Sequence, residues 1–290
     1  MKIIFRYFWK DFRVDRNIFS NLLAGLTSKG LKSIEVHSVF VRPRSLYSLV
    51  IFSRIRWSKL KDKLTKNRSL YLWYTGEMID PPSKYDLTIS FKPTSESNVY
   101  WPLWVTYIDL DNSAKKYDRE FSYNQQTLLK PRNIIIDEKR QWRICAFISN
   151  QVSWRMEIVS KLKDLGCIDI YGSVSGIKAE SKLEIAKNYV FQFCFENVIQ
   201  EGYVTEKPLE AWMCENIPIY AGGDTFQYLN TAAMIDCSTM AIHEIPKYIF
   251  HEISLVEKNL LRINSPILMK QYDFKNINEK LIAKANEVIK

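Results

Sequence analysis

Short apolar runs alternate with helix-like stretches along most of this chain, and this alternation restricts its fold more than any other feature. In the first 110 residues, 17–26 has the spacing of a helix that ends before Gly30. The expected strands of this part are the apolar runs 2–9, 33–40, 48–55, 69–74 and 85–91. Such alternation favours a mostly parallel sheet covered by helices.

A second alternation follows a polar segment at 111–133. Its expected strands are 143–149, 168–173, 189–195 and 217–223, and its expected helices are 153–166 and 205–216. Because 290 residues exceed the usual length of one domain, we predict an α/β protein with two Rossmann-like domains facing a cleft. The predicted domains are 1–137 and 138–290, with an amphipathic C-terminal helix from residue 276 docked on one of them.

Positive charge is concentrated at the N-terminus. Residues 1–70 hold 16 Lys and Arg against 4 Asp and Glu, although the net charge of the whole chain is only +9. The densest part, 53–69, alternates basic residues with Ile, Trp and Leu, as in an amphipathic helix or loop on an anionic surface. A nucleic-acid surface, an anionic membrane face and a plain solvated face all remain compatible with it.

The five cysteines are dispersed without a CxxC pair, and the chain has only three histidines. This pattern favours reduced core thiols in a cytoplasmic protein over a disulfide frame or a zinc site. The N-terminus lacks the continuous apolar stretch of a signal peptide, and no run reaches the roughly 18 residues needed to span a bilayer. His37, His243 and His251 are scattered, so structural roles are expected for them.

Reactive side chains follow three expected strands, where ligands gather in open parallel sheets. Glu77 follows 69–74, Asn150 follows 143–149, and Glu196 follows 189–195. Arg155 lies at the start of the next helix and carries a planar fork suited to phosphate. A carboxylate directly after a buried strand must be paired or functional, so Glu196 marks a candidate site.

The stretch FENVIQEGYVTEKPLEAW, at 195–212, has two interpretations. In one, Thr205 caps a helix whose free N–H groups and Lys207 attract an anion, and Pro208 is tolerated in its first turn. In the other, Glu206, Lys207 and Glu210 form the solvated side of an amphipathic helix. No glycine-rich phosphate loop is present, so helix starts and cations would have to hold any phosphate.

The segment FCFENVIQEGYVTEKPLEAWMCENIPIYAGG, at 193–223, resembles the signature of the alpha-1,3-fucosyltransferases, glycosyltransferase family 10. Three further stretches, 74–91, 100–105 and 145–155, resemble the same family in the same order. The resemblance implies the two-domain GT-B fold, with the acceptor sugar on the N-terminal domain and the nucleotide on the C-terminal domain. It also implies GDP-β-L-fucose as the donor and inversion at the anomeric carbon of fucose.

On this resemblance Glu77 is the general base. Lys207 and Arg155 would neutralise the β-phosphate, and Glu206 would hydrogen-bond hydroxyls of fucose or ribose. The complete set of implied donor-binding residues is Arg155, Asn197, Tyr203, Thr205, Glu206 and Lys207. The residues Met78, Val198 and Pro208 depart from the family pattern.

The expected acceptor is O3 of GlcNAc in N-acetyllactosamine-type glycans, as in Lewis-type antigen or lipopolysaccharide synthesis by a bacterial-type enzyme. Peripheral contact with the inner membrane face through the basic N-terminal region is expected, and a nucleic-acid partner is not. Asp109 and Asp111 form a DxD, a triplet that can hold a divalent metal ion. This one opens a polar linker and does not end a strand of a nucleotide-binding unit, so no metal or other cofactor is expected. The aromatic stretch 100–104 could stack on a sugar or pack in a core.

Two alternatives to this enzyme remain. One is a nucleic-acid-binding protein that uses the basic N-terminal quarter. The other is a homologue that binds the nucleotide sugar without catalysing transfer.

Overall fold

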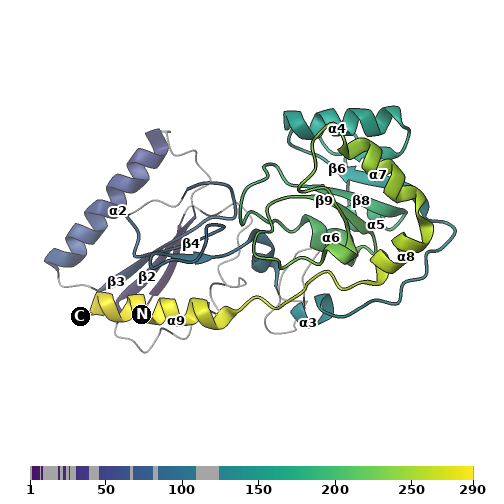
Figure 1. Cartoon of the computed structure of the whole chain (residues 1–290). Helices are drawn as coiled ribbons and strands as arrows, with labels where there is room; N and C mark the ends of the chain where they lie inside the picture. The colour runs from purple at the N-terminus through teal and green to yellow at the C-terminus, as the bar shows by residue number, and fades with distance from the viewer. Residues whose placement is uncertain are drawn as a thin grey trace. The chain divides into compact units, whose positions relative to one another are not determined.

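The computed structural model divides the chain into two compact units, each built on a parallel β-sheet (Figure 1). Unit 1 comprises residues 1–118 and 272–290, and unit 2 comprises residues 119–271. The predicted α/β class is therefore confirmed. The structure describes residues 2–6, 8, 19, 22–23, 26, 31–38, 46–65, 68–80, 84–108 and 124–289, with the backbone alone for 46–52.

The described strands of unit 1 pair in chain order, all of them parallel. They are β1 (Lys2–Arg6), β2 (Ser33–Ser38), β3 (Ser69–Tyr74), β4 (Leu87–Ser90) and β5 (Asn98–Tyr100). Every residue of β3 is buried, as expected for a central strand covered on both faces. The described helices are α2 (Leu46–Leu64), η1 (Leu103–Tyr107) and α9 (Phe274–Ile289). The predicted helix at 17–26 lies largely outside the described residues.

The predicted strand at 48–55 is wrong, because this run belongs to the helix α2. Ile55 is buried, and Lys59 and Asp62, which follow it at helical spacing, lie on the same side of the helix. Lys59 Nζ lies 2.7 Å from a carboxylate oxygen of Asp86, and the hydroxyl of Tyr71 donates to Asp62 at 2.8 Å. A short apolar run cannot by itself distinguish a strand from a helix, and here it continues into residues at helical spacing.

The predicted C-terminal helix is present as α9, but it belongs to unit 1 and not to the second predicted domain. Its buried side chains Ile277, Leu281 and Ala285 lie on one face, and the helix contacts β3 (Figure 1). Periodicity identified the apolar face of this helix but not the surface that covers it. The division of the structure therefore differs from the predicted boundary at 137, and unit 2 is an insertion within unit 1.

Unit 2 contains five parallel strands in the order β10-β9-β8-β6-β7. They are β6 (Gln141–Phe147), β7 (Ile168–Tyr171), β8 (Tyr189–Phe195), β9 (Ile217–Ala221) and β10 (Ile235–Asp236). Its helices are α3 (Gln125–Leu128), α4 (Ser153–Asp164), α5 (Lys182–Ala186), α6 (Lys207–Met213), η2 (Thr231–Ala233), α7 (Ile245–Ser254) and α8 (Val256–Asn264).

The strand order of unit 2 reverses direction between β6 and β8. The chain runs from β6 outward to β7, and then returns to β8, β9 and β10 on the opposite side of β6. In open α/β sheets the ligand crevice lies outside the carboxyl ends of the strands at such a reversal. The segments that follow Phe147 and Phe195 are therefore the first place to look for a site.

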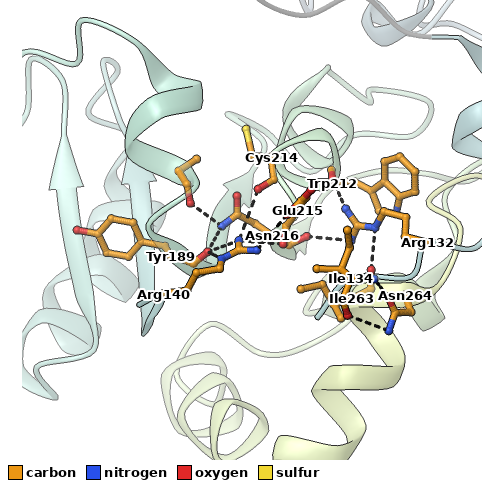
Figure 2. A network of polar contacts seen from close by, with 11 residues as sticks. Arg132, Ile134, Arg140, Tyr189, Trp212, Cys214, Glu215, Asn216, Ile263 and Asn264 are labelled. Carbon is orange, nitrogen blue, oxygen red and sulfur yellow. Dashed lines mark hydrogen bonds and ion pairs between the residues drawn. The ribbon is translucent and has the colours of Figure 1, made fainter. Parts of the chain in front are cut away.

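Two arginines hold the C-terminal end of α6 (Figure 2). Arg132 donates to the carbonyl oxygens of Trp212 and Ile263, and its guanidinium lies 4.2 Å from the centre of the Trp212 ring. Arg140 donates to the carbonyl oxygens of Tyr189, at 3.1 Å, and of Glu215, at 2.9 Å. The last carbonyls of a helix lack partners within it, so these cations fix α6 from the end opposite Lys207.

The first and last segments of unit 2 are hydrogen-bonded to each other. The backbone N–H of Arg132 donates to the carbonyl of Asn264 at 2.8 Å, and that of Leu268 donates to the carbonyl of Leu128 at 3.1 Å. The N–H of Ile134 adds a bond to the side chain of Asn264 at 2.6 Å. The two ends of the insertion therefore close on one another.

Candidate active site

A fully buried carboxylate lies at the carboxyl end of β8. Glu196 accepts hydrogen bonds from the backbone N–H of Thr205 at 2.7 Å and from the ammonium of Lys207 at 2.7 Å. The Thr205 hydroxyl lies within 2.9 Å of both carboxylate oxygens. Glu196 thus ties the end of the strand to the start of α6, which satisfies the requirement that a buried charge be paired.

The ammonium of Lys207 is held at the start of α6. Two of its three donors are directed at Glu196 and at the Thr205 hydroxyl, the latter at 2.9 Å, and its side chain is 25% exposed. One donor therefore remains for a further acceptor. Burial disfavours the charged ammonium, but the carboxylates of Glu196 and Glu206 outweigh it and raise the pKa of Lys207 above its ordinary value.

Glu206 carries an unused acceptor beside this ammonium. Its Oε2 atom is buried and has no hydrogen-bond partner among the described residues. Glu206 is also the residue that precedes α6, whereas Thr205, the predicted cap, uses its side chain to bind Glu196. The helix is accordingly shorter than the predicted 205–216. An unpartnered buried carboxylate oxygen is costly, and a hydroxyl group of a ligand would satisfy it.

Arg155 lies at the strand reversal, but its guanidinium contacts main chain. One Nη donates to the carbonyl of Phe195 at 3.1 Å, and the other donates to the carbonyl of Asn150 at 2.7 Å. Its Nε is buried without a partner among the described residues. Burial lowers the pKa of Arg155, and the nearby carboxylate of Glu196 opposes this effect. The side chain therefore links the ends of β8 and of the loop after β6.

The loop from 197 to 205 carries the other implied donor ligands. Asn197 is half-buried, and its carbonyl accepts from the indole of Trp154 at 3.3 Å. Tyr203 is buried, and its backbone N–H donates to the carbonyl of Gln200 at 3.0 Å. All six implied donor-binding residues therefore lie in unit 2 on segments at the carboxyl ends of β6 and β8, and the structure brings Thr205 and Lys207 into direct contact.

A cavity of about 410 Å³ lies between this loop and the segment after β9. Gln200 lines one wall, and Gly222, Gly223 and Asp224 line the other. Neither glycine has room for a side chain. A Cβ at Gly223 would overlap the carbonyl of Gln200, and a Cβ at Gly222 would lie 2.9 Å from Cγ of Glu196. The cavity thus lies at the same edge of the sheet as the charged cluster.

In unit 1, Glu77 lies on a turn directly after β3. The Thr75 hydroxyl accepts from the backbone N–H of Glu77 at 3.0 Å and donates to its carbonyl at 3.1 Å. A Cβ at Gly76 would overlap Cδ1 of Leu103 and would lie 3.0 Å from the hydroxyl of Tyr74. The turn is therefore shaped by backbone bonds and by a glycine with no room for a side chain, and the Glu77 side chain is partly exposed.

The aromatic stretch 100–104 packs in the core of unit 1. Trp101 and Trp104 are fully shielded from solvent, and Tyr100 is buried. The Trp101 indole donates to the hydroxyl of Thr106 at 3.0 Å, and that hydroxyl also lies 2.9 Å from the Tyr74 hydroxyl. The core interpretation of this stretch is confirmed for the two tryptophans.

Sequence reasoning missed a second ion pair next to the cluster. Lys182, at the start of α5, binds the buried carboxylate of Glu210 at 3.1 Å. Burial disfavours the charged Lys182, yet Glu210 and Glu206 raise its pKa. The only local signal was the capping pattern that begins at Ser181, whose hydroxyl accepts from the N–H of Glu184.

The histidines do not gather at this site. His37 is buried, and its ring nitrogens lie 3.2 Å from the Tyr85 hydroxyl and 3.2 Å from the Glu35 carboxylate. Among the described residues, no three His, Cys, Asp or Glu side chains form a cluster suited to a metal ion. Asp109 and Asp111 lie outside the described residues.

Comparison with known proteins relates part of this chain to one family. Residues 136–259 match the family model "Glycosyltransferase family 10 (fucosyltransferase) C-term". A protein of Acanthamoeba polyphaga mimivirus that is provisionally named a fucosyltransferase is 27% identical over 181 residues, covering 56% of this chain and 27% of that protein. Alpha-(1,3)-fucosyltransferase C of Drosophila melanogaster is 21% identical over 243 residues, covering 74% of this chain and 55% of that one. The chain spans about half or less of the length of these relatives.

A crystal structure of an alpha1,3-fucosyltransferase has a similar fold. It superposes with a TM-score of 0.67 at 18% identity, over 99% of this chain and 89% of that one. A crystal structure of an alpha1,3-fucosyltransferase with GDP-fucose gives a TM-score of 0.66 at 16% identity, over 98% and 90%. The predicted GT-B fold class is confirmed by this likeness.

Proposed function

Because residues 136–259 match the model of glycosyltransferase family 10, we propose that this chain transfers L-fucose from GDP-β-L-fucose to a glycan hydroxyl with inversion at the anomeric carbon. One observation carries the proposal. At the reversal of the unit 2 sheet, within the segment matched by the family model, the Lys207 ammonium and the unpartnered Oε2 of Glu206 lie on adjacent residues. A diphosphate and a sugar hydroxyl are the ligand groups that complement this pair.

We assign the diphosphate to Lys207, with its remaining donor on a β-phosphate oxygen. Arg155 would assist from the strand ends, by electrostatic attraction or by redirecting one of its N–H groups from a main-chain carbonyl. Glu206 would accept a hydrogen bond from a hydroxyl of fucose or ribose. Asn197 and Tyr203, on the intervening loop, would position the nucleotide, and Thr205 would hold the ammonium in place.

We assign proton abstraction to Glu77. Its carboxylate takes the proton of the acceptor hydroxyl while the acceptor oxygen forms a bond to the anomeric carbon of fucose. The bond from that carbon to the β-phosphate oxygen breaks on the opposite face, which inverts the configuration, and GDP leaves with the electron pair. The transition state has oxocarbenium character, so a carboxylate at the acceptor side suits the reaction.

No general acid is needed, because a phosphate leaving group is already acidic. Fixed positive charge from Lys207 and Arg155 is expected to stabilise the departing GDP. We therefore propose that transfer requires neither a metal ion nor another cofactor. Retention of full activity in the presence of a strong chelator tests this directly.

For the acceptor we propose O3 of GlcNAc in N-acetyllactosamine-type glycans, as in Lewis-type antigens or lipopolysaccharide. The name of the Drosophila relative supports the α1,3 linkage, but it does not extend to the acceptor. We also propose a cytoplasmic location. All five cysteines are buried and free, which is the state that a reducing compartment maintains.

The test is to incubate the protein with GDP-fucose and N-acetyllactosamine without added metal, and to follow products by mass spectrometry. We expect one deoxyhexose to be added, with linkage analysis assigning it to O3 of GlcNAc. If no member of a panel of Gal- and GlcNAc-containing acceptors is modified while GDP-fucose still raises the melting temperature, the chain is a binding homologue that has lost catalysis. The proposed activity would then be rejected.

A further inference from the structure

The outer face of α2 combines exposed apolar and basic side chains. We use this name for seven exposed residues of α2: Arg54, Arg56, Trp57, Leu60, Lys61, Lys63 and Leu64. The apolar members are unusually open, at 71% exposed for Trp57, 46% for Leu60 and 77% for Leu64. Their spacing of three and four residues places them in one line along the helix.

Basic residues border this line on both sides. At 100° per residue, Arg56 and Lys63 lie on one side of the apolar line, and Arg54 and Lys61 lie on the other. Within the described part of the chain, no carboxylate forms an ion pair with any of the four. The only acid of the helix, Asp62, points to the sheet and accepts from the Tyr71 hydroxyl.

The opposite side of α2 is already used. Ile55 is 2% exposed, Lys59 binds Asp86 just before β4, and Asp62 accepts from Tyr71 of β3. Trp57 and Arg54 border a cavity together with Glu35 and His37 of β2, but Trp57, Leu60 and Leu64 all remain largely open to solvent. Single exposed leucines are common on protein surfaces, but two leucines and an indole in register between four cations that have no ion-pair partner among the described residues are not explained by solvation alone.

We propose that the outer face of α2 binds the surface of an anionic lipid bilayer, with the helix in the plane of the interface. Trp57, Leu60 and Leu64 enter the boundary between headgroups and acyl chains, and the four cations reach the phosphates at either side. The charge complementarity favours anionic lipid, and the long aliphatic stems of Lys and Arg suit this position. A nucleic acid would engage the cations but would gain nothing from Leu60 and Leu64. The inference is independent of the proposed reaction.

The test is flotation of the full chain with vesicles of phosphatidylcholine alone or with about 30% phosphatidylglycerol. We expect binding to the anionic vesicles only, weakened when salt rises from about 0.1 to 0.5 M. The double variants Trp57→Ser/Leu64→Ser and Arg56→Glu/Lys63→Glu should each lower partitioning by about tenfold or more. Because these side chains are exposed, circular dichroism should show unchanged folding.

Matched controls remove similar groups from unit 2. Leu261→Ser/Met269→Ser deletes two exposed apolar side chains, and Lys139→Glu/Lys178→Glu reverses two exposed charges. Both should bind vesicles like the unmodified chain. Absence of vesicle binding, or equal loss in the control variants, would overturn the proposal. So would binding to duplex DNA that Arg56→Glu/Lys63→Glu abolishes and Trp57→Ser/Leu64→Ser leaves unchanged, if vesicles are not bound.

Discussion

The two candidate parts of the site are held by different means. In unit 2, Glu196, Thr205 and Lys207 form a set of buried, mutually hydrogen-bonded side chains. In unit 1, the turn that carries Glu77 is shaped by backbone bonds to Thr75 and by the absence of a side chain at Gly76.

Because of this difference, substitutions in the two units should differ in how strongly they affect folding relative to binding or catalysis. In unit 2 the residues assigned to donor binding also hold the strand end to the helix, so a substitution there should affect folding and binding together. In unit 1 the assigned base is a partly exposed side chain on a turn that its backbone closes with Thr75. A partly exposed carboxylate contributes less to stability than a buried ion pair, so removing it should affect catalysis more than folding.

The largest effect is expected for Glu77→Gln. Loss of the general base should lower kcat by about 10³-fold, while the KM for GDP-fucose stays unchanged and the melting temperature falls less than it does when a buried ion pair is broken. Steady-state kinetics and thermal unfolding measure these quantities. The control is Glu96→Gln, which neutralises an exposed glutamate of the same unit. A large fall in melting temperature would mean that Glu77 supports the fold.

Lys207→Met should destabilise unit 2 by roughly 3 kcal/mol, because it leaves the carboxylate of Glu196 buried without its cation. Denaturant unfolding provides the measurement, and stabilisation by GDP should be lost as well. The double variant Glu196→Gln/Lys207→Met should recover much of the stability but none of the GDP binding. If the double variant is as unstable as the single one, the pair is not the reason for the loss.

Arg132→Met should cost roughly 2 kcal/mol, since the carbonyls at the end of α6 and at Ile263 lose their donor. Hydrogen exchange should speed up in α6 and β9 but not in β3. Arg143 offers a matched control: it pairs with Asp169 at the surface, both side chains being about one third exposed, so Arg143→Met should cost less than about 1 kcal/mol. Equal costs for the two variants would contradict the anchoring role.

Gly76→Ala should distort the Glu77 turn, because the added methyl group overlaps Leu103. We expect a cost of about 1–2 kcal/mol and a lower kcat with unchanged KM for GDP-fucose. Shortening the neighbour in Gly76→Ala/Leu103→Ala should restore part of kcat. If Gly76→Ala has the activity of the unmodified chain, the geometry of this turn does not position the base.

The smallest effect is expected from alkaline pH. The pKa of Lys207 is raised above its ordinary value of 10.5, so stabilisation from its charged form is complete below that value and is lost only as pH rises through the folded-state pKa. The rise in melting temperature caused by GDP should therefore be constant from about pH 6 to 9. A decline within this interval would show that Lys207 loses its proton earlier.

Secondary structure was predictable where a strand is covered on both faces. The runs 69–74 and 189–195 have the bounds of β3 and β8, because every side chain there is buried and the apolar run ends where the strand ends. α2 was not predictable in this way, because several of its apolar residues are exposed and do not pack in the core of unit 1. The unit on which α9 packs also could not be predicted from the sequence, because periodicity shows that a helix has an apolar face but not which surface covers it.

The location of the candidate residues at the strand ends was predictable from the sequence, but most of their side-chain partners were not. The strand-end argument led to Glu196 and its neighbours, and the motif resemblance added Glu77. Neither argument predicts that the guanidinium of Arg155 binds main-chain carbonyls, or that Lys182 pairs with Glu210. The bond of Arg155 to Phe195 and the pair of Lys182 with Glu210 join residues 40 and 28 positions apart in sequence.

The closed ends of unit 2 have a consequence for how such chains can be recombined. Leu128 and Arg132 are hydrogen-bonded to Leu268 and Asn264, so the first and last described segments of this unit lie side by side. We therefore expect a gene segment encoding residues 124–269 to be exchangeable as a cassette. Chimaeras that exchange this cassette between relatives, or circular permutants cut within unit 1, would keep its internal bonds intact.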